Sequence, residues 1–339
     1  MVDEAEELEE AEDPIEIAVA YYSASGPSMK RCAFLAMRYD AAAGYRPGDG
    51  ETWVGINDYS PEFQGTTRVT NGTNAWYTKA WCSLSGALFI TRHDGWVVRN
   101  PNIWAPEVLT SWENDRIEGY HLRGVFGLDG GAVFVWGHDP RASAGQVYPA
   151  SSLFRWDGKA WSPMTAPGFH VMAMHGTAED NLWVAGPRGV VARWDGGRWT
   201  QLPSRQDELV NSLWVAGPDE VYATTAQGSV LEGSAAGMLP IGTIPGVATP
   251  GEVACVAKWQ GQLWVGASRL GLFRRIGTTR DFESVKPNID CVSMDARDEL
   301  VLCCNNRVSG TANGADYRSC GVDSVLQVRA PFALGQRLG

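Results

Sequence analysis

Residues 182–199 read LWVAGPRGVVARWDGGRW, and this stretch decides the fold. An apolar–aromatic pair opens one strand, a short turn follows, and a second strand ends in an Asp-Gly step with another aromatic residue beyond it. Asp-Gly steps favour hairpin turns, because glycine readily takes up the positive φ that such turns need. The stretch therefore predicts antiparallel strands joined by tight turns.

The same order of residues recurs along the chain at a nearly constant spacing. Residues 88–104 read LFITRHDGWVVRNPNIW, with the strand-opening pair in the same place. Six such pairs are Leu88-Phe89, Val133-Phe134, Leu182-Trp183, Val221-Tyr222, Leu263-Trp264 and Leu300-Val301. Their spacing averages about 42 residues, which fits one four-stranded propeller blade and does not fit helical or leucine-rich repeats.

Blade boundaries follow from this spacing. We predict six complete blades at residues 75–110, 120–166, 169–204, 208–244, 250–288 and 289–320. Residues 15–22, 32–40 and 51–58 read as three strands without an innermost partner, while residues 321–330 read as one strand with nothing after it. We therefore predict an all-β, seven-bladed β-propeller whose ring is closed by a C-terminal inner strand joining the three N-terminal strands. Such closure removes exposed sheet edges.

Composition agrees with one all-β domain. The chain of 339 residues contains 15 Trp, 39 Gly and 18 Pro, which is typical of short aromatic strands joined by many turns. Eight acidic residues lie within residues 1–13, and removing their charges from the net charge of −11 leaves −3. We expect residues 1–14 to be a disordered acidic tail, a candidate for contact with a basic surface, and residues 15–339 to form the propeller.

Charge and cysteine usage argue against several classes of partner. The nearly neutral remainder of the chain lacks the basic surface that nucleic acids require. The N-terminus is acidic rather than basic and apolar, and no apolar run approaches the ~20 residues that span a bilayer. We therefore expect a cytoplasmic protein that contacts neither nucleic acid nor membrane. No C-x-x-C pair occurs among the seven cysteines, which indicates reduced thiols.

The repeats resemble those of bacterial WD40-like and kelch-like β-propellers, with W-D-G-x-x-W at residues 156–161 and 194–199. The resemblance covers nearly the whole chain and is specific for the fold. It implies no single activity, since propellers include lectins, hydrolases and scaffolds.

Residues with catalytic potential form no recognisable motif. The five histidines, at positions 93, 121, 138, 170 and 175, form no H-x-x-H or H-E-x-x-H pairing, which indicates core or channel-lining imidazoles rather than a metal site. A G-x-S-x-G nucleophile motif and a glycine-rich phosphate loop are both absent from the sequence. We predict no catalytic residue, no metal and no cofactor.

Three long connections point to a binding surface. In our strand assignment, residues 59–74 and 111–120 join successive blades, and residues 138–150 join the second and third strands of one blade. Such connections share one face of a propeller, and long loops gathered on one face are typical of function. The predicted partner-binding residues are Phe63, Arg68, Trp112, Glu113, Arg116, Tyr120, Arg141 and Tyr148.

These observations favour a non-catalytic, protein-binding propeller: a scaffold, an assembly subunit or an inhibitor of the immunity type. A carbohydrate-binding lectin is the alternative, because exposed Trp and Tyr stack on sugars. Three blades lack the Trp-Asp-Gly element that a repeated sugar pocket would need. A glycoside-hydrolase-like enzyme is a third possibility, since Glu113, Asp115 and Glu118 share one loop.

Overall fold

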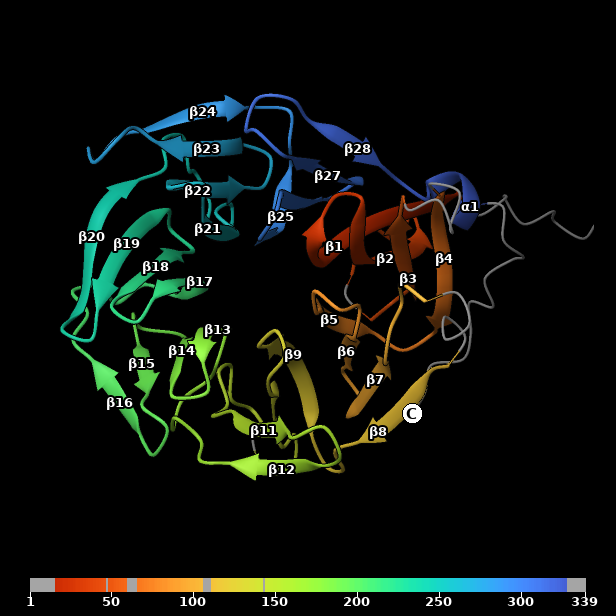
Figure 1. The fold of residues 1–339 in the computed structure, drawn as a ribbon, viewed down its shortest axis with the longest axis horizontal. Coiled ribbons are helices and arrows are strands. Elements are labelled where there is room, and N and C mark those ends of the chain that lie inside the picture. Colours follow the sequence, from red (N-terminus) through yellow and green to blue (C-terminus); the bar gives the residue numbers. More distant parts are fainter. Residues whose placement is uncertain (1–15, 47, 60–65, 106–110, 143, 328–339) are drawn as a thin grey trace, which may run out of the picture.

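The computed structural model describes residues 16–46, 48–59, 66–105, 111–142 and 144–327. Within them, 28 strands form seven antiparallel sheets of four strands each, and one short helix follows the last strand. The sheets stand as blades around a central channel (Figure 1). The predicted seven-bladed β-propeller is confirmed.

The blades follow one another in chain order, and the first strand of each lines the channel. Blade 1 contains β1 (Ile17–Ser28), β2 (Arg31–Asp40), β3 (Glu51–Asp58) and β4 (Thr66–Thr73). Blade 2 contains β5 (Tyr77–Cys82), β6 (Leu88–Arg92), β7 (Trp96–Asn100) and β8 (Glu113–Arg116). Blade 3 contains β9 (His121–Gly127), β10 (Val133–His138), β11 (Ser152–Trp156) and β12 (Trp161–Met164). Blade 4 contains β13 (Ala173–Ala178), β14 (Asn181–Ala185), β15 (Val191–Trp194) and β16 (Trp199–Leu202).

The remaining blades repeat this arrangement. Blade 5 contains β17 (Val210–Gly217), β18 (Glu220–Thr225), β19 (Ser229–Ser234) and β20 (Gly237–Thr243). Blade 6 contains β21 (Cys255–Trp259), β22 (Gln262–Ala267), β23 (Gly271–Arg275) and β24 (Phe282–Lys286). Blade 7 contains β25 (Cys291–Ala296), β26 (Leu300–Cys304), β27 (Arg307–Thr311) and β28 (Arg318–Cys320), and the helix α1 (Asp323–Gln327) follows.

The core lies between the blades. Each adjacent pair of blades encloses its own cluster of buried apolar side chains, so the described residues hold seven clusters around the ring. Trp136, Trp183 and Trp264, all on second strands, are among the largest fully buried side chains. Their bulk fills the wedge that opens between two twisted sheets.

The Asp-Gly turns have the backbone conformation that the repeat predicts. Gly158 and Gly196, the second residues of two Asp-Gly steps, have φ values of 97° and 93°. The Asp195 carboxylate accepts hydrogen bonds from the backbone N–H groups of Gly197 and Arg198. These bonds stabilise the charged form and hold the pKa of Asp195 below its usual value.

The predicted closure of the ring is wrong. Blade 1 takes all four strands from the N-terminal part of the chain, with β1 as its inner strand. The inner position next to β2 is therefore occupied, and residues 323–327 form α1 instead of a strand. Val322 and Leu326, 2% and 0% exposed, pack into the cluster between blades 7 and 1. The helix thus connects blade 7 to blade 1 by side-chain packing and not by adding a strand to the sheet of blade 1.

Candidate functional site

The structure confirms one of the three predicted long connections. Residues 138–150 do lie between the second and third strands of blade 3, since β10 ends at His138 and β11 begins at Ser152. Residues 59–74 and 111–120 are not simply connections, because they contain β4 and β8. The prediction of three loops on one face is wrong for a physical reason. Outer strands are half solvated and carry too few apolar residues to be recognised.

Phe63 is outside the described residues, and Arg68, Trp112 and Glu113 lie in or beside these two strands. Arg68 belongs to β4, and Trp112 packs half-buried against the cluster between blades 1 and 2. Glu113, at the start of β8, forms an ion pair with Arg99 of the neighbouring strand. Trp112 therefore has a packing role in the structure, and Glu113 an electrostatic one.

The other four predicted residues are divided between two places. Arg116 lies on β8 with its guanidinium carbon 5.3 Å from the centre of the Trp96 ring. Tyr120 packs edge-on against an aromatic ring of β11. Arg141 and Tyr148 share the connection between β10 and β11. Of the eight residues, the structure joins these two on one loop, and partner binding by the set stays a prediction.

A row of histidines occupies one face of the ring, which we call the top face. His93 lies in the turn between β6 and β7, His121 begins β9, His138 ends β10, and His170 precedes β13. Successive ring centres are 4.2, 5.6 and 6.4 Å apart. All four positions are at the same end of their blades, because the start of a first strand lies beside the end of the antiparallel second strand. Blades 2, 3 and 4 therefore contribute to one imidazole row.

A cavity lies beside this row. Its volume is about 490 Å³, and it is lined by Trp76, Arg123, His138, Tyr148 and His170, among others. The Trp76 ring stacks on His93 at 5.5 Å, and the Tyr148 ring is 5.6 Å from that of His170. We call this cavity the histidine pocket.

The imidazoles of the row are neutral at neutral pH. Burial, with neighbouring imidazoles and a nearby guanidinium group as smaller contributions, lowers the pKa of His93 and of His138 to about 4. Burial also lowers the pKa of His121 and of His170. Nδ1 of His170 lies 2.7 Å from the carbonyl oxygen of Pro149, to which it donates. In the neutral ring Nε2 of His170 is then a hydrogen-bond acceptor.

Arg123 is the cation of the histidine pocket. Its guanidinium carbon lies 5.9 Å from the centre of the Trp76 ring. Within the part of the chain that the structure describes, it makes no ion pair with a carboxylate. Nδ1 of His138 is buried and has no hydrogen-bond partner among those residues. The pocket thus combines one guanidinium group and flat aromatic surfaces with the acceptor nitrogen Nε2 of His170.

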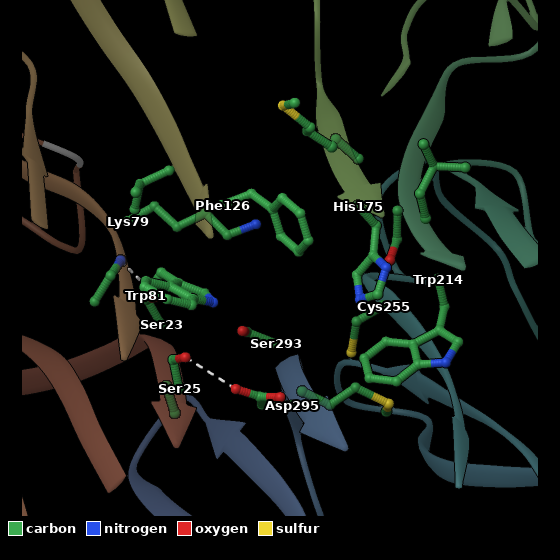
Figure 2. Close-up of a pocket in the computed structure, with 18 of the residues that line it drawn as sticks. Ser23, Ser25, Lys79, Trp81, Phe126, His175, Trp214, Cys255, Ser293 and Asp295 are labelled. Atoms are coloured by element: carbon green, nitrogen blue, oxygen red, sulfur yellow. Dashed lines mark hydrogen bonds between the residues drawn. The ribbon is translucent and has the colours of Figure 1, made fainter. Parts of the chain in front are cut away.

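A second cavity of about 580 Å³ occupies the central channel and is lined by residues of all seven inner strands. Figure 2 shows Lys79, Trp81, Phe126, His175 and Trp214 around it. The fifth histidine of the sequence is therefore channel-lining, as predicted, and is separate from the row.

Across the described ranges of the chain, no group of three or more His, Cys, Asp or Glu side chains is arranged to hold a metal ion. Over the same ranges, no helix is both long and apolar enough to cross a membrane.

Solved structures of other proteins share the propeller architecture of this chain. No protein-family profile matches the sequence, and no curated protein does. Among solved structures, the WD40 β-propeller domain of Doa1 has a TM-score of 0.61 at 10% identity, covering 88% of this chain and 91% of that one. The chain is similar in fold to WD40 propellers. Sqt1 of Saccharomyces cerevisiae has a TM-score of 0.58 at 8% identity, with 91% and 86% covered.

A third similar structure is described as YCF48 bound to D1 peptide. It has a TM-score of 0.57 at 9% identity and covers 86% of this chain and 92% of that one. At such low identities the likeness concerns the fold of these propellers and not their residues.

Sequence reasoning missed the histidine pocket. The four histidines of the row are separated by 28, 17 and 32 positions, so no spacing motif relates them. The repeat itself holds a signal, because each histidine falls at or beside the top end of a first or second strand. Recognising it requires the register of blades 2 to 4, together with the knowledge of which strand ends meet on one face.

Proposed function

We propose that this protein is a non-catalytic β-propeller that binds a segment of another protein at the histidine pocket. One observation carries the proposal: Val147 is 83% exposed and Tyr148 46% exposed, and both line the pocket. Large apolar side chains left in water beside a cavity are typical of interaction sites. Tyrosine is also enriched among residues that dominate binding energy at interfaces.

The polar groups of the pocket suit a peptide. Arg123 can bind a carboxylate as a bidentate ion pair, in which two parallel N–H groups donate to the two carboxylate oxygens. Nε2 of His170 can accept a hydrogen bond from a backbone N–H, and the Trp76 ring offers a flat surface to a side chain. An extended segment with an acidic residue next to an apolar one would use all of these groups.

The comparisons support this proposal by analogy. A propeller of similar fold is described as bound to a peptide, so the architecture is compatible with such a ligand. A role as cytoplasmic scaffold, assembly subunit or inhibitor of the immunity type belongs to the same proposal. Each of these roles requires a rigid ring that presents one face to a partner protein.

Selection of peptides from a random display library tests the proposal and does not require the partner to be identified first. The wild-type protein is expected to enrich a family of sequences that share an acidic residue next to an apolar one. The double variant Arg123→Glu/Tyr148→Ala removes the cation and the exposed ring, and should not retain those peptides.

A matched control carries a similar pair of changes elsewhere. Arg198, whose side chain is 81% exposed, and Leu239, 54% exposed, lie outside the histidine pocket. Arg198→Glu/Leu239→Ala should bind the selected peptides as the wild type does. Failure to enrich any peptide, or equal retention by the pocket variant, contradicts the proposal. Binding on a glycan array in place of peptides would favour the lectin alternative.

A further inference from the structure

The central channel has one continuous aromatic wall. The His175 ring of β13 lies between the Phe126 ring of β9 and the Trp214 ring of β17, with centre-to-centre distances of 5.0 and 4.4 Å. Trp81 of β5 faces the same cavity (Figure 2). The wall offers flat apolar surface to anything that enters the channel.

His175 adds a hydrogen-bond donor to this wall. The backbone N–H of Val215 donates to Nδ1 of His175 over 3.1 Å, so the proton of the neutral ring is on Nε2. Burial lowers the pKa of His175 to about 3, which keeps the ring neutral in the physiological range. Nε2–H makes no hydrogen bond to any residue in the described ranges. It is available to a ligand.

Lys79 adds a cation. It lies two residues before Trp81 on β5, and alternate residues of a strand face the same side, so both line the cavity. In the described ranges its ammonium group forms no ion pair, and it lies 5.8 Å from the centre of the Trp136 ring. Burial lowers the pKa of Lys79, and its charge in turn lowers the pKa of His175. The two groups are therefore within electrostatic range.

The acidic groups of the channel are engaged elsewhere. Asp295 accepts hydrogen bonds from the Ser25 hydroxyl at 2.9 Å and the Gly26 N–H at 3.0 Å, and forms an ion pair with Arg297 at 2.7 Å. Arg297 also approaches Asp129, at 3.5 Å. These contacts pair both carboxylates with Arg297. Asp295 acts on Lys79 only at longer range, where its charge raises the lysine pKa against the larger effect of burial. Lys79 is therefore the cation of the cavity that has no direct carboxylate partner in the described ranges.

We propose that the central channel binds a small organic anion. Its carboxylate or phosphate group would accept hydrogen bonds from the Lys79 ammonium and from Nε2–H of His175, and its apolar or aromatic body would lie against Trp81, Phe126 and Trp214. A volume of about 580 Å³ is in the range of small-molecule sites. The channel site is independent of peptide binding at the histidine pocket, and either can fail without the other.

Calorimetric titration with simple probes tests the channel site. Benzoate and phenyl phosphate carry the two candidate anionic groups on one ring, and benzamide has nearly the shape of benzoate without its charge. The wild-type protein should bind at least one of the anions saturably and benzamide at least tenfold more weakly, because a charge-assisted hydrogen bond contributes about tenfold or more in affinity. Comparing the two anions distinguishes a carboxylate site from a phosphate site.

Lys79→Met tests the cation, with Lys159→Met, on an exposed turn, as the matched control. Lys79→Met should lose about tenfold or more in affinity for the anion, while the control keeps wild-type affinity. Because an ammonium group without an acidic partner costs desolvation energy, the melting temperature of Lys79→Met should equal or exceed that of the wild type. Unchanged affinity in Lys79→Met would overturn the proposal.

A measurement on the wild-type protein does not depend on any variant. In a ¹H–¹³C spectrum of the histidine rings, saturating benzoate or phenyl phosphate should shift the His175 signals and leave the four signals of the row in place. Absence of saturable binding by both anions, or shifts confined to the row, would overturn the channel site.

Discussion

Replacing Leu326 by alanine tests the contact that joins the C-terminal helix to the first blade. Leu326 is 0% exposed and shares its cluster with Tyr21, Phe34 and Val322. Replacement of a buried leucine by alanine costs about 2–5 kcal/mol, through lost apolar burial and the cavity left behind. We expect about 2–3 kcal/mol here, because a five-residue helix at one side of the ring can relax toward the gap.

Two hydrogen bonds depend on the same docking. The guanidinium group of Arg38 donates from Nη1 to the carbonyl oxygen of Leu326 at 3.0 Å, and the N–H of Val322 donates to the hydroxyl oxygen of Tyr21 at 2.6 Å. If Leu326→Ala released the helix completely, these bonds would also be lost. The cost would then exceed the expected range by about 1–3 kcal/mol.

Unfolding in guanidinium chloride, followed by tryptophan fluorescence, measures this cost. Val325→Ala is the control, since Val325 belongs to the same helix but is 44% exposed, and its replacement should change stability by less than about 0.5 kcal/mol. The same small effect for both variants would show that the helix does not hold the ring. The reasoning would then be refuted.

Two further predictions concern protonation and packing. The free energy of unfolding should fall as the pH drops from 6.5 toward 4, by at most about 1.4 kcal/mol per pH unit for each of His93, His138 and His175. The unfolded chain binds protons on these three histidines near pH 6.5, whereas the folded protein binds them only near pH 4 on His93 and His138 and near pH 3 on His175. Denaturant titrations at several pH values would measure how the free energy of unfolding depends on pH. A free energy that does not change with pH would contradict the prediction. Gly124→Ala should lower stability by about 1–3 kcal/mol, because a Cβ there would meet the Trp136 ring at 2.2 Å; thermal unfolding checks this, and an unchanged melting temperature would refute the close packing.

The repeat makes most of the fold predictable. Asp-Gly turns and apolar–aromatic pairs mark the second strands, which are buried, and the partly buried third strands. These signals locate blades 3 to 7 to within a few residues, and blade 2 without its outer strand β8. Blade 1 is misassigned from the sequence because its outer strand β4 reads TTRVTNGT, without an apolar alternation. With that strand unseen, the inner strand β1 is taken for a second strand, and a C-terminal strand seems to be needed.

The candidate sites are less predictable than the fold. Residues of the histidine pocket come from three blades, so their proximity depends on the register of each blade and on which face each turn reaches. Lys79 stands out in the sequence as a charged residue in an inner strand, YTKAWC, although only the structure shows that no acidic group pairs with it in the described ranges. Tyr148 lies in the one predicted connection that the structure confirms, and its role in binding stays a prediction.

Spectra of the histidine rings in the presence of a selected peptide test protein recognition most directly. His138 and His170 line the pocket, whereas His175 lines the channel. A peptide that occupies the pocket should shift the ring signals of His138 and His170 and leave those of His175 unchanged. Shifts of His175 alone, or of none of the five rings, would contradict binding at the top face.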